Sequence, residues 1–199
     1  MSFSDIIGNE KIKKDLQESV ENGSFSHSYM FVGNDGIGKK MIAKEFAKNI
    51  LCLSDKKNNC ETCDSCIKFI SGNNPDYIEI IPDGNSIKIS QIREMQENVY
   101  QKPIVSNKKV FIIDEAEKMT VEAQNSLLKT LEEPPEYIVI IIITSNENKM
   151  LNTVKSRCMR INFINLTPKE IENYINKNNI VVNSKNIVEM CNGSIRQTG

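Results

Sequence analysis

The most informative residues form the stretch GNDGIGKK at positions 33–40, which has the glycine spacing of a loop that holds phosphate groups. Glycines at these positions let backbone N–H groups turn toward an anion, and a following helix adds its positive end. An apolar strand pattern before the stretch and a helical pattern after it supply the context that such a loop needs. We therefore predict phosphate contacts from the loop residues Gly33, Gly36, Gly38, Lys39 and Lys40.

Position 40 departs from this pattern, because such loops carry a serine or threonine hydroxyl there. The hydroxyl normally binds magnesium, whereas the ammonium of Lys40 cannot bind a cation and repels it. Nucleotide binding can persist through backbone N–H groups and Lys39, but metal-assisted hydrolysis is expected to be slow or absent. A second interpretation stays open, in which the stretch is a relic loop that holds only an adventitious anion.

Carboxylates and amides stand where two other apolar segments end. Asp114 and Glu115 close the run VFIIDE, and in a phosphate-loop fold the first would meet magnesium while the second would polarise an attacking water. Asn146 ends the next apolar run after Thr144 and Ser145, where one of the three could sense a terminal phosphate. Solvated loop acids and a simple turn are the ordinary alternatives for these two groups.

Four of the six cysteines are grouped with the spacing C-x7-C-x2-C-x2-C. Four thiolates satisfy a tetrahedral zinc ion and leave no open position, so such a site would be structural rather than catalytic. The sequence starts without a secretory leader pattern, which favours a bound metal over disulfides. The alternative is a loop of reduced cysteines without metal. The predicted ligands are Cys52, Cys60, Cys63 and Cys66.

Two arginines have positions from which they could reach a nucleotide. Arg157, within the tripeptide SRC, precedes the last predicted strand, where its guanidinium can point out of its own subunit toward phosphates bound by a neighbour. Arg196 lies in GSIR near the end of the chain and could reach back to a nucleotide held by its own loop. An ordinary surface location is the alternative for each.

Strand-like and helix-like segments alternate five times, which predicts an α/β fold with a doubly wound parallel sheet flanked by helices. The fourth strand-like segment is apolar enough for the buried centre of the sheet. The strand-like segments are 28–33, 76–82, 108–116, 137–146 and 159–164. Helical patterns occupy 10–22, 39–51, 90–101, 120–135 and 151–158. A domain boundary is expected near residue 165, because a purely helical pattern begins with Thr167 as a cap, Pro168 and Glu170.

The composition indicates a folded protein without a strongly charged surface. Among 199 residues, 25 lysines and arginines nearly balance 26 aspartates and glutamates, and 39% of the residues are hydrophobic. This balance argues against intrinsic disorder and against a zinc-dependent protein that binds duplex DNA by itself. No apolar run approaches the length of a membrane span, so we expect a cytoplasmic protein with no membrane partner.

Four segments resemble, in order along nearly the whole chain, the clamp-loader branch of the AAA+ proteins and, within it, the delta-prime subunits of bacterial DNA polymerase III. They are FSHSYMFVGNDGIGKK, NPDYIEIIPDGNSIKISQIREM, KKVFIIDEAEKMTVEAQNSLLKTLEEPP and LNTVKSRCMRI, with the cysteine group between the first two. LLKTLEEPP and SRC are highly specific to clamp loaders, whereas PDYIEIIPDG and IKISQIRE favour delta-prime over tau/gamma subunits.

The resemblance implies an AAA+ phosphate-loop module over residues 1–165, with a zinc module inserted at residues 52–66. It also implies that residues 166–199 begin a helical lid. The chain is expected to be truncated, because the collar domain that follows the lid in this family is absent. In the family, the subunit joins tau/gamma and delta subunits in a hetero-pentamer that loads the sliding clamp on primer-template DNA.

The resemblance also implies roles for individual residues. Arg157 would be an arginine finger offered to the ATP of a neighbouring tau/gamma subunit, while this subunit acts as a stator with little or no ATPase activity. Many delta-prime subunits have defective phosphate loops, and Lys40 fits that habit. Gly33, Gly38 and Lys39 persist, however, together with both acids of the VFIIDE run, which leaves binding of ATP or ADP open. The alternative is a tau/gamma-type motor subunit that hydrolyses ATP.

Overall fold

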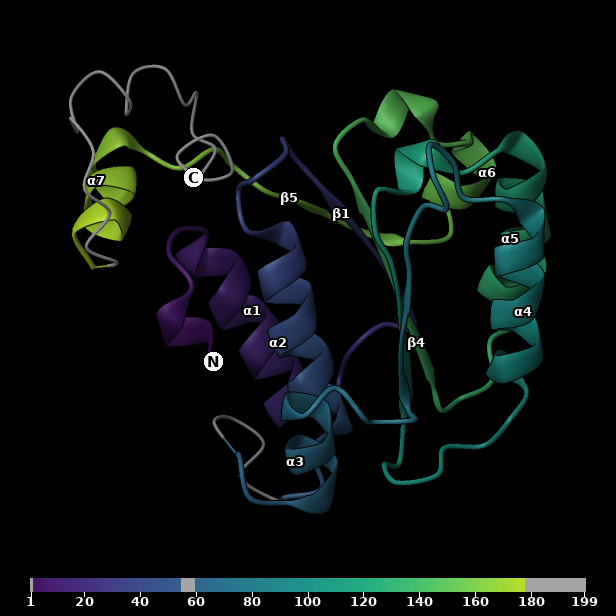
Figure 1. Cartoon of the computed structure of the whole chain (residues 1–199), viewed down its shortest axis with the longest axis horizontal. Coiled ribbons are helices and arrows are strands. Elements are labelled where there is room, and N and C mark those ends of the chain that lie inside the picture. Colours follow the sequence, from purple (N-terminus) through teal and green to yellow (C-terminus); the bar gives the residue numbers. More distant parts are fainter. Residues whose placement is uncertain (1, 55–59, 178–199) are drawn as a thin grey trace.

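A five-stranded parallel sheet forms the centre of the computed structural model, which describes residues 2–54 and 60–177 (Figure 1). The strand order is β2-β3-β4-β1-β5, and each neighbouring pair runs parallel. The strands are β1 (Ser28–Val32), β2 (Tyr77–Ile80), β3 (Lys109–Ile113), β4 (Ile138–Thr144) and β5 (Met159–Asn162). The parallel sheet predicted from the alternating pattern is therefore confirmed.

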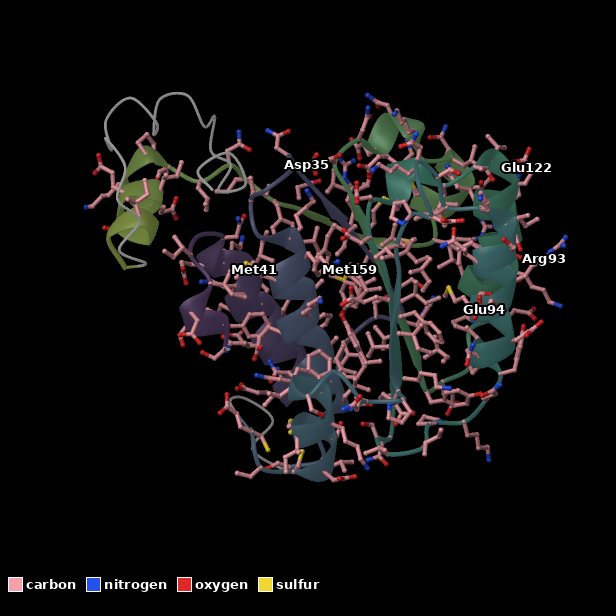
Figure 2. All side chains as sticks on the ribbon, in the orientation of Figure 1. Asp35, Met41, Arg93, Glu94, Glu122 and Met159 are labelled. Carbon is pink, nitrogen blue, oxygen red and sulfur yellow. The ribbon has the colours of Figure 1, made fainter. Side chains whose placement is uncertain are left out.

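Helices cover both faces of this sheet (Figure 1). One face packs against α1 (Glu10–Glu21) and α2 (Lys39–Leu51), and the other packs against α4 (Ile89–Val99) and α5 (Val121–Glu132). The outward faces of α4 and α5 carry charged side chains such as Arg93, Glu94 and Glu122 (Figure 2). The shorter elements are η1 (Phe3–Asp5), α3 (Asp64–Ile70), η2 (Ala116–Lys118), η3 (Glu147–Lys149), α6 (Asn152–Lys155) and α7 (Pro168–Lys177).

The central strand β4 shows why its sequence is an unbroken apolar run. Val139, Ile141 and Ile143 point into the core cluster shared with α1 and α2. The alternate residues of the strand point into the cluster shared with α4 and α5. Every residue of β4 is buried, so both faces of the strand need apolar side chains. Each buried isoleucine stabilises the fold by about 2 kcal/mol relative to an exposed one.

The region after β5 begins as the sequence predicted. The backbone N–H and hydroxyl of Thr167 donate to the Glu170 carboxylate at 2.7 Å each, while the Glu170 N–H donates back to the Thr167 hydroxyl. This reciprocal arrangement is a capping box, and Pro168 occupies the first helical position of α7. Most of the expected lid, residues 178–199 with Arg196, lies outside the described residues. Within the described ranges, every helix is too short or too polar to cross a membrane.

Candidate functional site

A cavity of about 240 Å³ lies where the carboxyl ends of β3 and β4 meet the glycine loop and the N-terminal segment. Ligands of parallel α/β proteins bind at this edge of the sheet. Five acidic and two basic side chains contribute to its wall. The lining residues are Asp5, Ile6, Ile7, Asp35, Gly36, Gly38, Lys39, Lys40, Met41, Asp114, Glu115, Glu117, Ile143 and Ser145.

The glycine loop takes the turn that its sequence predicts. Gly36 and Gly38 have φ values of +74° and +89°, a conformation that favours glycine, and α2 starts directly after Gly38. Lys39 is only 6% exposed, and its ammonium donates to the carbonyls of Gly33 and Asn34 at 2.6 Å each. Gly33 does not line the cavity but packs against Phe163, whose Cβ would lie 2.9 Å from an added Cβ. These hydrogen bonds from the buried Lys39 side chain stabilise the conformation of the loop.

Lys40 forms ion pairs at the cavity wall. Its ammonium lies 3.0 Å from Asp114 Oδ2 and 3.1 Å from Glu79 Oε2. Glu79 also pairs with the Lys44 ammonium at 2.5 Å and accepts a hydrogen bond from the Tyr77 hydroxyl at 2.5 Å. The predicted metal-binding carboxylate of Asp114 is thus already paired with the lysine that replaces the usual hydroxyl.

The surroundings keep this network charged. Burial raises the pKa of Glu79, but hydrogen bonds from Lys44, Tyr77 and Lys40 outweigh burial and leave that pKa below its usual value. Burial likewise lowers the pKa of Lys40, yet the hydrogen bonds and attraction of Asp114 and Glu79 raise it above the usual value overall. Lysine and carboxylate are therefore both ionised at neutral pH.

Two further carboxylates of the cavity are also paired within the chain. Glu115 adopts a left-handed backbone conformation with φ of +50°, and its carboxylate lies 2.6 Å from the Lys118 ammonium. Glu117 accepts hydrogen bonds from the hydroxyls of Thr144 and Ser145 at 2.9 and 2.5 Å and from the Ser145 N–H at 3.1 Å. These bonds outweigh the effect of burial and lower the pKa of Glu117.

The end of β4 supplies Ser145, rather than Asn146, to the cavity wall. The Asn146 side chain instead accepts a hydrogen bond from the Asn148 N–H at 3.1 Å and caps η3. Sequence reasoning also missed Glu79 and Glu117. An acid inside the apolar run of β2 was a usable signal for Glu79, whereas nothing in the sequence distinguishes Glu117 from other acids near a strand end.

The four predicted cysteine ligands come together. One sulfur from each of Cys52, Cys60, Cys63 and Cys66 lies within 4.8 Å of the others, and the Cys52 and Cys63 sulfurs are 3.9 Å apart. Tetrahedral zinc with four sulfur ligands at about 2.3 Å requires sulfur pairs about 3.8 Å apart. Backbone N–H groups of Cys63 and Thr62 lower the pKa of Cys60 to about 6, whereas burial raises the pKa of Cys52 to about 11. This donor set fits a metal ion such as zinc.

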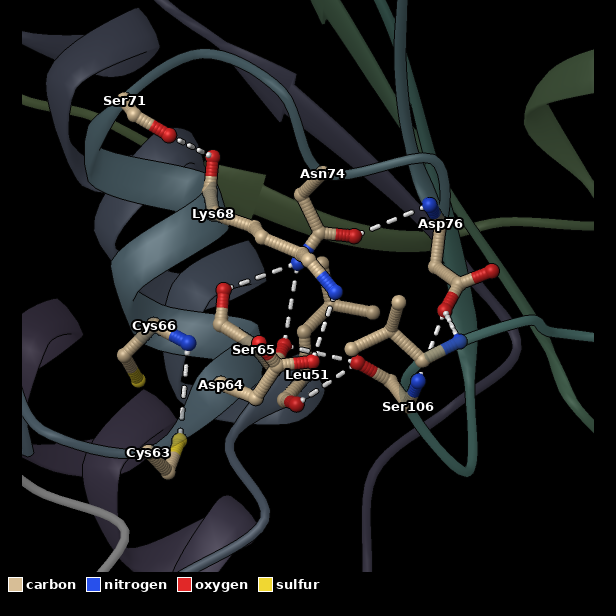
Figure 3. A network of polar contacts seen from close by, with 11 residues as sticks. Leu51, Cys63, Asp64, Ser65, Cys66, Lys68, Ser71, Asn74, Asp76 and Ser106 are labelled. Carbon is tan, nitrogen blue, oxygen red and sulfur yellow. Dashed lines mark hydrogen bonds and ion pairs between the residues drawn. The ribbon is translucent and has the colours of Figure 1, made fainter.

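A buried polar network fixes this cysteine module to the sheet (Figure 3). The Ser65 hydroxyl on α3 contacts the Ser106 hydroxyl at 2.7 Å, and the Asn74 amide donates to the Ser65 carbonyl at 2.9 Å. The Ser106 hydroxyl donates to the Leu51 carbonyl at the end of α2. Asp76 accepts three backbone N–H bonds from residues 104–106, at 2.7 Å each. The module is therefore joined to α2, β2 and the segment before β3.

The predicted arginine finger, Arg157, lies outside the cavity. It follows α6 and precedes β5, and its guanidinium binds the Glu132 carboxylate at 2.6 Å and the Thr153 carbonyl at 2.8 Å. Its side chain is 34% exposed. Because the cavity lies at the carboxyl edge of the sheet, Arg157 is placed at the opposite end of β5 from the subunit's own glycine loop. Arg196 is outside the described residues.

The strand order, the glycine loop between β1 and α2, and the carboxylates after β3 define a phosphate-loop α/β protein of the AAA+ type. Residues 8–167 match the model of the family described as "DNA polymerase III, delta subunit". The chain belongs to this family.

Curated relatives agree with the family match. The chain is 41% identical over 162 residues to DNA polymerase III subunit delta' of Bacillus subtilis, covering 81% of this chain and 49% of that protein. It is 38% identical over 176 residues to subunit tau of the same organism, covering 88% of this chain and 31% of that protein. The chain thus spans less than half the length of either relative.

Solved structures agree on the fold. A DNA polymerase III gamma subunit-related protein of Thermotoga maritima has a TM-score of 0.62 and 22% identity, covering 95% of this chain and 55% of that chain. The RuvB Holliday junction branch migration motor of Thermotoga maritima has a TM-score of 0.62 and 16% identity, covering 99% of this chain and 61% of that chain. At these identities, the likeness concerns the fold.

Proposed function

We propose that this chain acts as a delta-prime-type subunit of the bacterial DNA polymerase III clamp loader, a stator with little or no ATPase activity. The observation that carries the proposal is the Lys40–Asp114 ion pair within a member of this polymerase family. Metal-assisted phosphoryl transfer needs a cation coordinated by the phosphate-loop hydroxyl and the strand-end aspartate. Here a lysine replaces the first ligand and neutralises the second.

In this proposal, Arg157 is the group that the subunit contributes to catalysis. Its position on the surface, away from the subunit's own cavity, supports a role toward nucleotide bound by an adjoining subunit. The adjoining subunits would be tau/gamma and delta in a hetero-pentamer that opens the sliding clamp and loads it on primed DNA. The cysteine module would hold one structural zinc ion, and the protein would work in the cytoplasm.

A second candidate is a tau/gamma-type motor subunit that hydrolyses ATP itself. The 38% identity with the tau subunit of Bacillus subtilis supports this alternative almost as well as the 41% identity with delta' supports the first. Position 40 discriminates between the two, since a motor requires the hydroxyl that orders magnesium.

The test is the ATPase activity of a clamp loader reconstituted with this subunit and its tau/gamma and delta partners. We expect Arg157→Ala to reduce clamp-dependent hydrolysis by about tenfold or more, because one arginine finger contributes about 10³–10⁵ in kcat. The matched control is Arg160→Ala, since Arg160 also pairs with an acid, Glu147 at 2.7 Å. Unchanged hydrolysis with Arg157→Ala would remove the finger role. Turnover by the lone subunit equal to that of the complex would favour the motor alternative.

A further inference from the structure

We propose that Glu132 is a positioning residue, whose carboxylate orients the Arg157 guanidinium toward the phosphates held by an adjoining subunit. This inference rests on the proposed function, in which Arg157 is an arginine finger, and extends it to the residue that holds the finger. Glu132 is the last residue of α5, whereas Arg157 lies between α6 and β5. The ion pair therefore joins two elements through residues that are 25 positions apart in the sequence.

The first argument is the way in which the guanidinium is held. Arg157 Nη2 lies 2.6 Å from Glu132 Oε1, and Arg157 Nη1 donates to the Thr153 carbonyl at 2.8 Å. Because two nitrogens of a planar group are bound to different elements, the direction of the group is fixed as well as its position. A guanidinium carries five N–H donors, and these contacts use one from each Nη. The remaining donors are left for phosphate oxygens of another chain.

The second argument is that both residues of the pair are attached to the core. Leu131, next to Glu132, and Val154, three residues before Arg157, are buried in the same hydrophobic cluster. The buried side chain of Gln124 joins α5 to the segment before α6. Its amide donates to the last carbonyl of η3 at 3.0 Å, and its oxygen accepts the N–H of the residue before α6 at 2.8 Å. The carboxylate thus fixes the arginine relative to a rigid base.

The third argument is that the stability of α5 does not account for an acid at position 132. The C-terminal end of a helix carries a partial negative charge, so a carboxylate in the last turn is unfavourable. The positive charge of Arg157 offsets this repulsion, but the two side chains are 34% and 49% exposed, and exposed ion pairs contribute little to folding. The main consequence of the pair is therefore the orientation of the arginine.

The test is steady-state ATP hydrolysis by a clamp loader reconstituted with this subunit and its tau/gamma and delta partners. We expect Glu132→Ala to lower kcat about three- to tenfold, because one of two contacts is lost and a misplacement of about 1 Å can cost about 10²-fold. The KM for ATP should stay the same, since an arginine finger acts in the transition state. Glu132→Gln should restore most of the rate, because its amide oxygen can still accept from Arg157 Nη2.

Glu133→Ala is the matched control. This neighbouring acid is also exposed, but among the described residues the ion pair of Arg157 is with Glu132. The double variant Glu132→Ala/Arg157→Ala should be no slower than Arg157→Ala, since Glu132 acts through the arginine. Thermal melts of each variant subunit show whether it is folded.

The outcomes separate this inference from the proposed function. A wild-type kcat with Glu132→Ala, beside slow hydrolysis with Arg157→Ala, overturns the inference and leaves the finger role standing. Faster hydrolysis with Glu132→Ala also overturns it, because the pair would then restrain the arginine. So does a double variant slower than Arg157→Ala, since Glu132 would then act independently. Unchanged hydrolysis with Arg157→Ala removes the finger role itself, and the inference with it.

Discussion

The glycine-loop cavity and the cysteine module both gather groups that bind cations, but their positive charge comes from different sources. At the cavity wall, Asp114 pairs with Lys40, and the adjoining carboxylate of Glu79 pairs with Lys40 and Lys44, at distances of 2.5–3.1 Å. In the module, the sulfurs that the structure describes contact one another, backbone N–H groups and a threonine hydroxyl. The cavity wall contains its own cation, Lys40, whereas a cation for the module would have to come from solution.

This difference indicates how far the stability of each region depends on an added ion. The Lys40 ammonium neutralises carboxylate charge at the cavity wall without any added ion. Under the proposed function, it does so in place of the magnesium that the fold usually binds. Thiols that are buried ionise poorly without a metal, as the raised pKa values of Cys52 and Cys66 show. A metal ion that replaces their protons therefore contributes directly to the stability of the module.

Removing the metal expected at the cysteine module should have the largest effect on stability. If it has no effect, the proposed difference between the module and the cavity is wrong. We expect one equivalent of zinc per chain, and we expect its removal to lower stability by about 4 kcal/mol, or the melting temperature by about 10 °C. Cys60→Ser should lose the metal, whereas the control Cys158→Ser, outside the cluster, should retain it. Elemental analysis and thermal melts measure both. Protein purified without chelator that contains no metal would contradict the prediction.

Replacing the cation of the cavity should have an intermediate effect that depends on pH. Lys40→Met leaves two partly buried carboxylates without this partner, so we expect a loss of about 1–2 kcal/mol at pH 7. Because the pKa of Glu79 is lower in the folded protein, its stabilising contribution is present above the unfolded value of about 4.3 and is lost as pH falls through the folded value. The difference between wild type and Lys40→Met should therefore shrink below about pH 4.

Urea denaturation of both proteins at neutral and acidic pH measures this difference. Any metal that the cysteine module loses at low pH would be lost by wild type and variant alike, so its effect on stability cancels in the difference. An equal difference at the two pH values would mean that the lysine acts through the packing of its aliphatic chain and not through its charge. In that case the proposal that the Lys40 charge neutralises Asp114 would fail as well.

The sequence predicted the elements of the fold better than the contacts of the site. The spacing of hydrophobic residues and the composition of the segments were enough to predict the parallel sheet. The reason is that β4 must be apolar on both faces and that the strands alternate with helices. The helix α3 was not predicted, since its seven residues are too few for a periodic pattern. It begins where the Cys63 sulfur accepts the Cys66 N–H, a cap that depends on the folded cysteine cluster.

The partners of Lys40 were beyond sequence reasoning for a different reason. Glu79 reaches Lys40 only because β2 pairs with β3, which places Ile80 beside Ile113 and brings the ends of the two strands together. The sequence pattern predicts the strands but does not show which strand pairs with which. Asn146 and Ser145 show the same limit, because one residue of a turn decides which side chain lines the cavity and which caps η3.

The smallest effect should come from a lysine of the cysteine module, and it sharpens the contrast with Lys40. Lys68 pairs with Asp64 one helical turn away at 2.7 Å, and the two side chains are 40% and 62% exposed. Such an exposed pair contributes about 0.3–0.5 kcal/mol, so Lys68→Ala should barely change the free energy of unfolding and should leave zinc content at one equivalent. Urea denaturation and metal analysis provide the measurement. A loss of unfolding free energy as large as that of Lys40→Met would mean that a lysine also stabilises the cysteine module. The two regions would then not differ in the source of their positive charge.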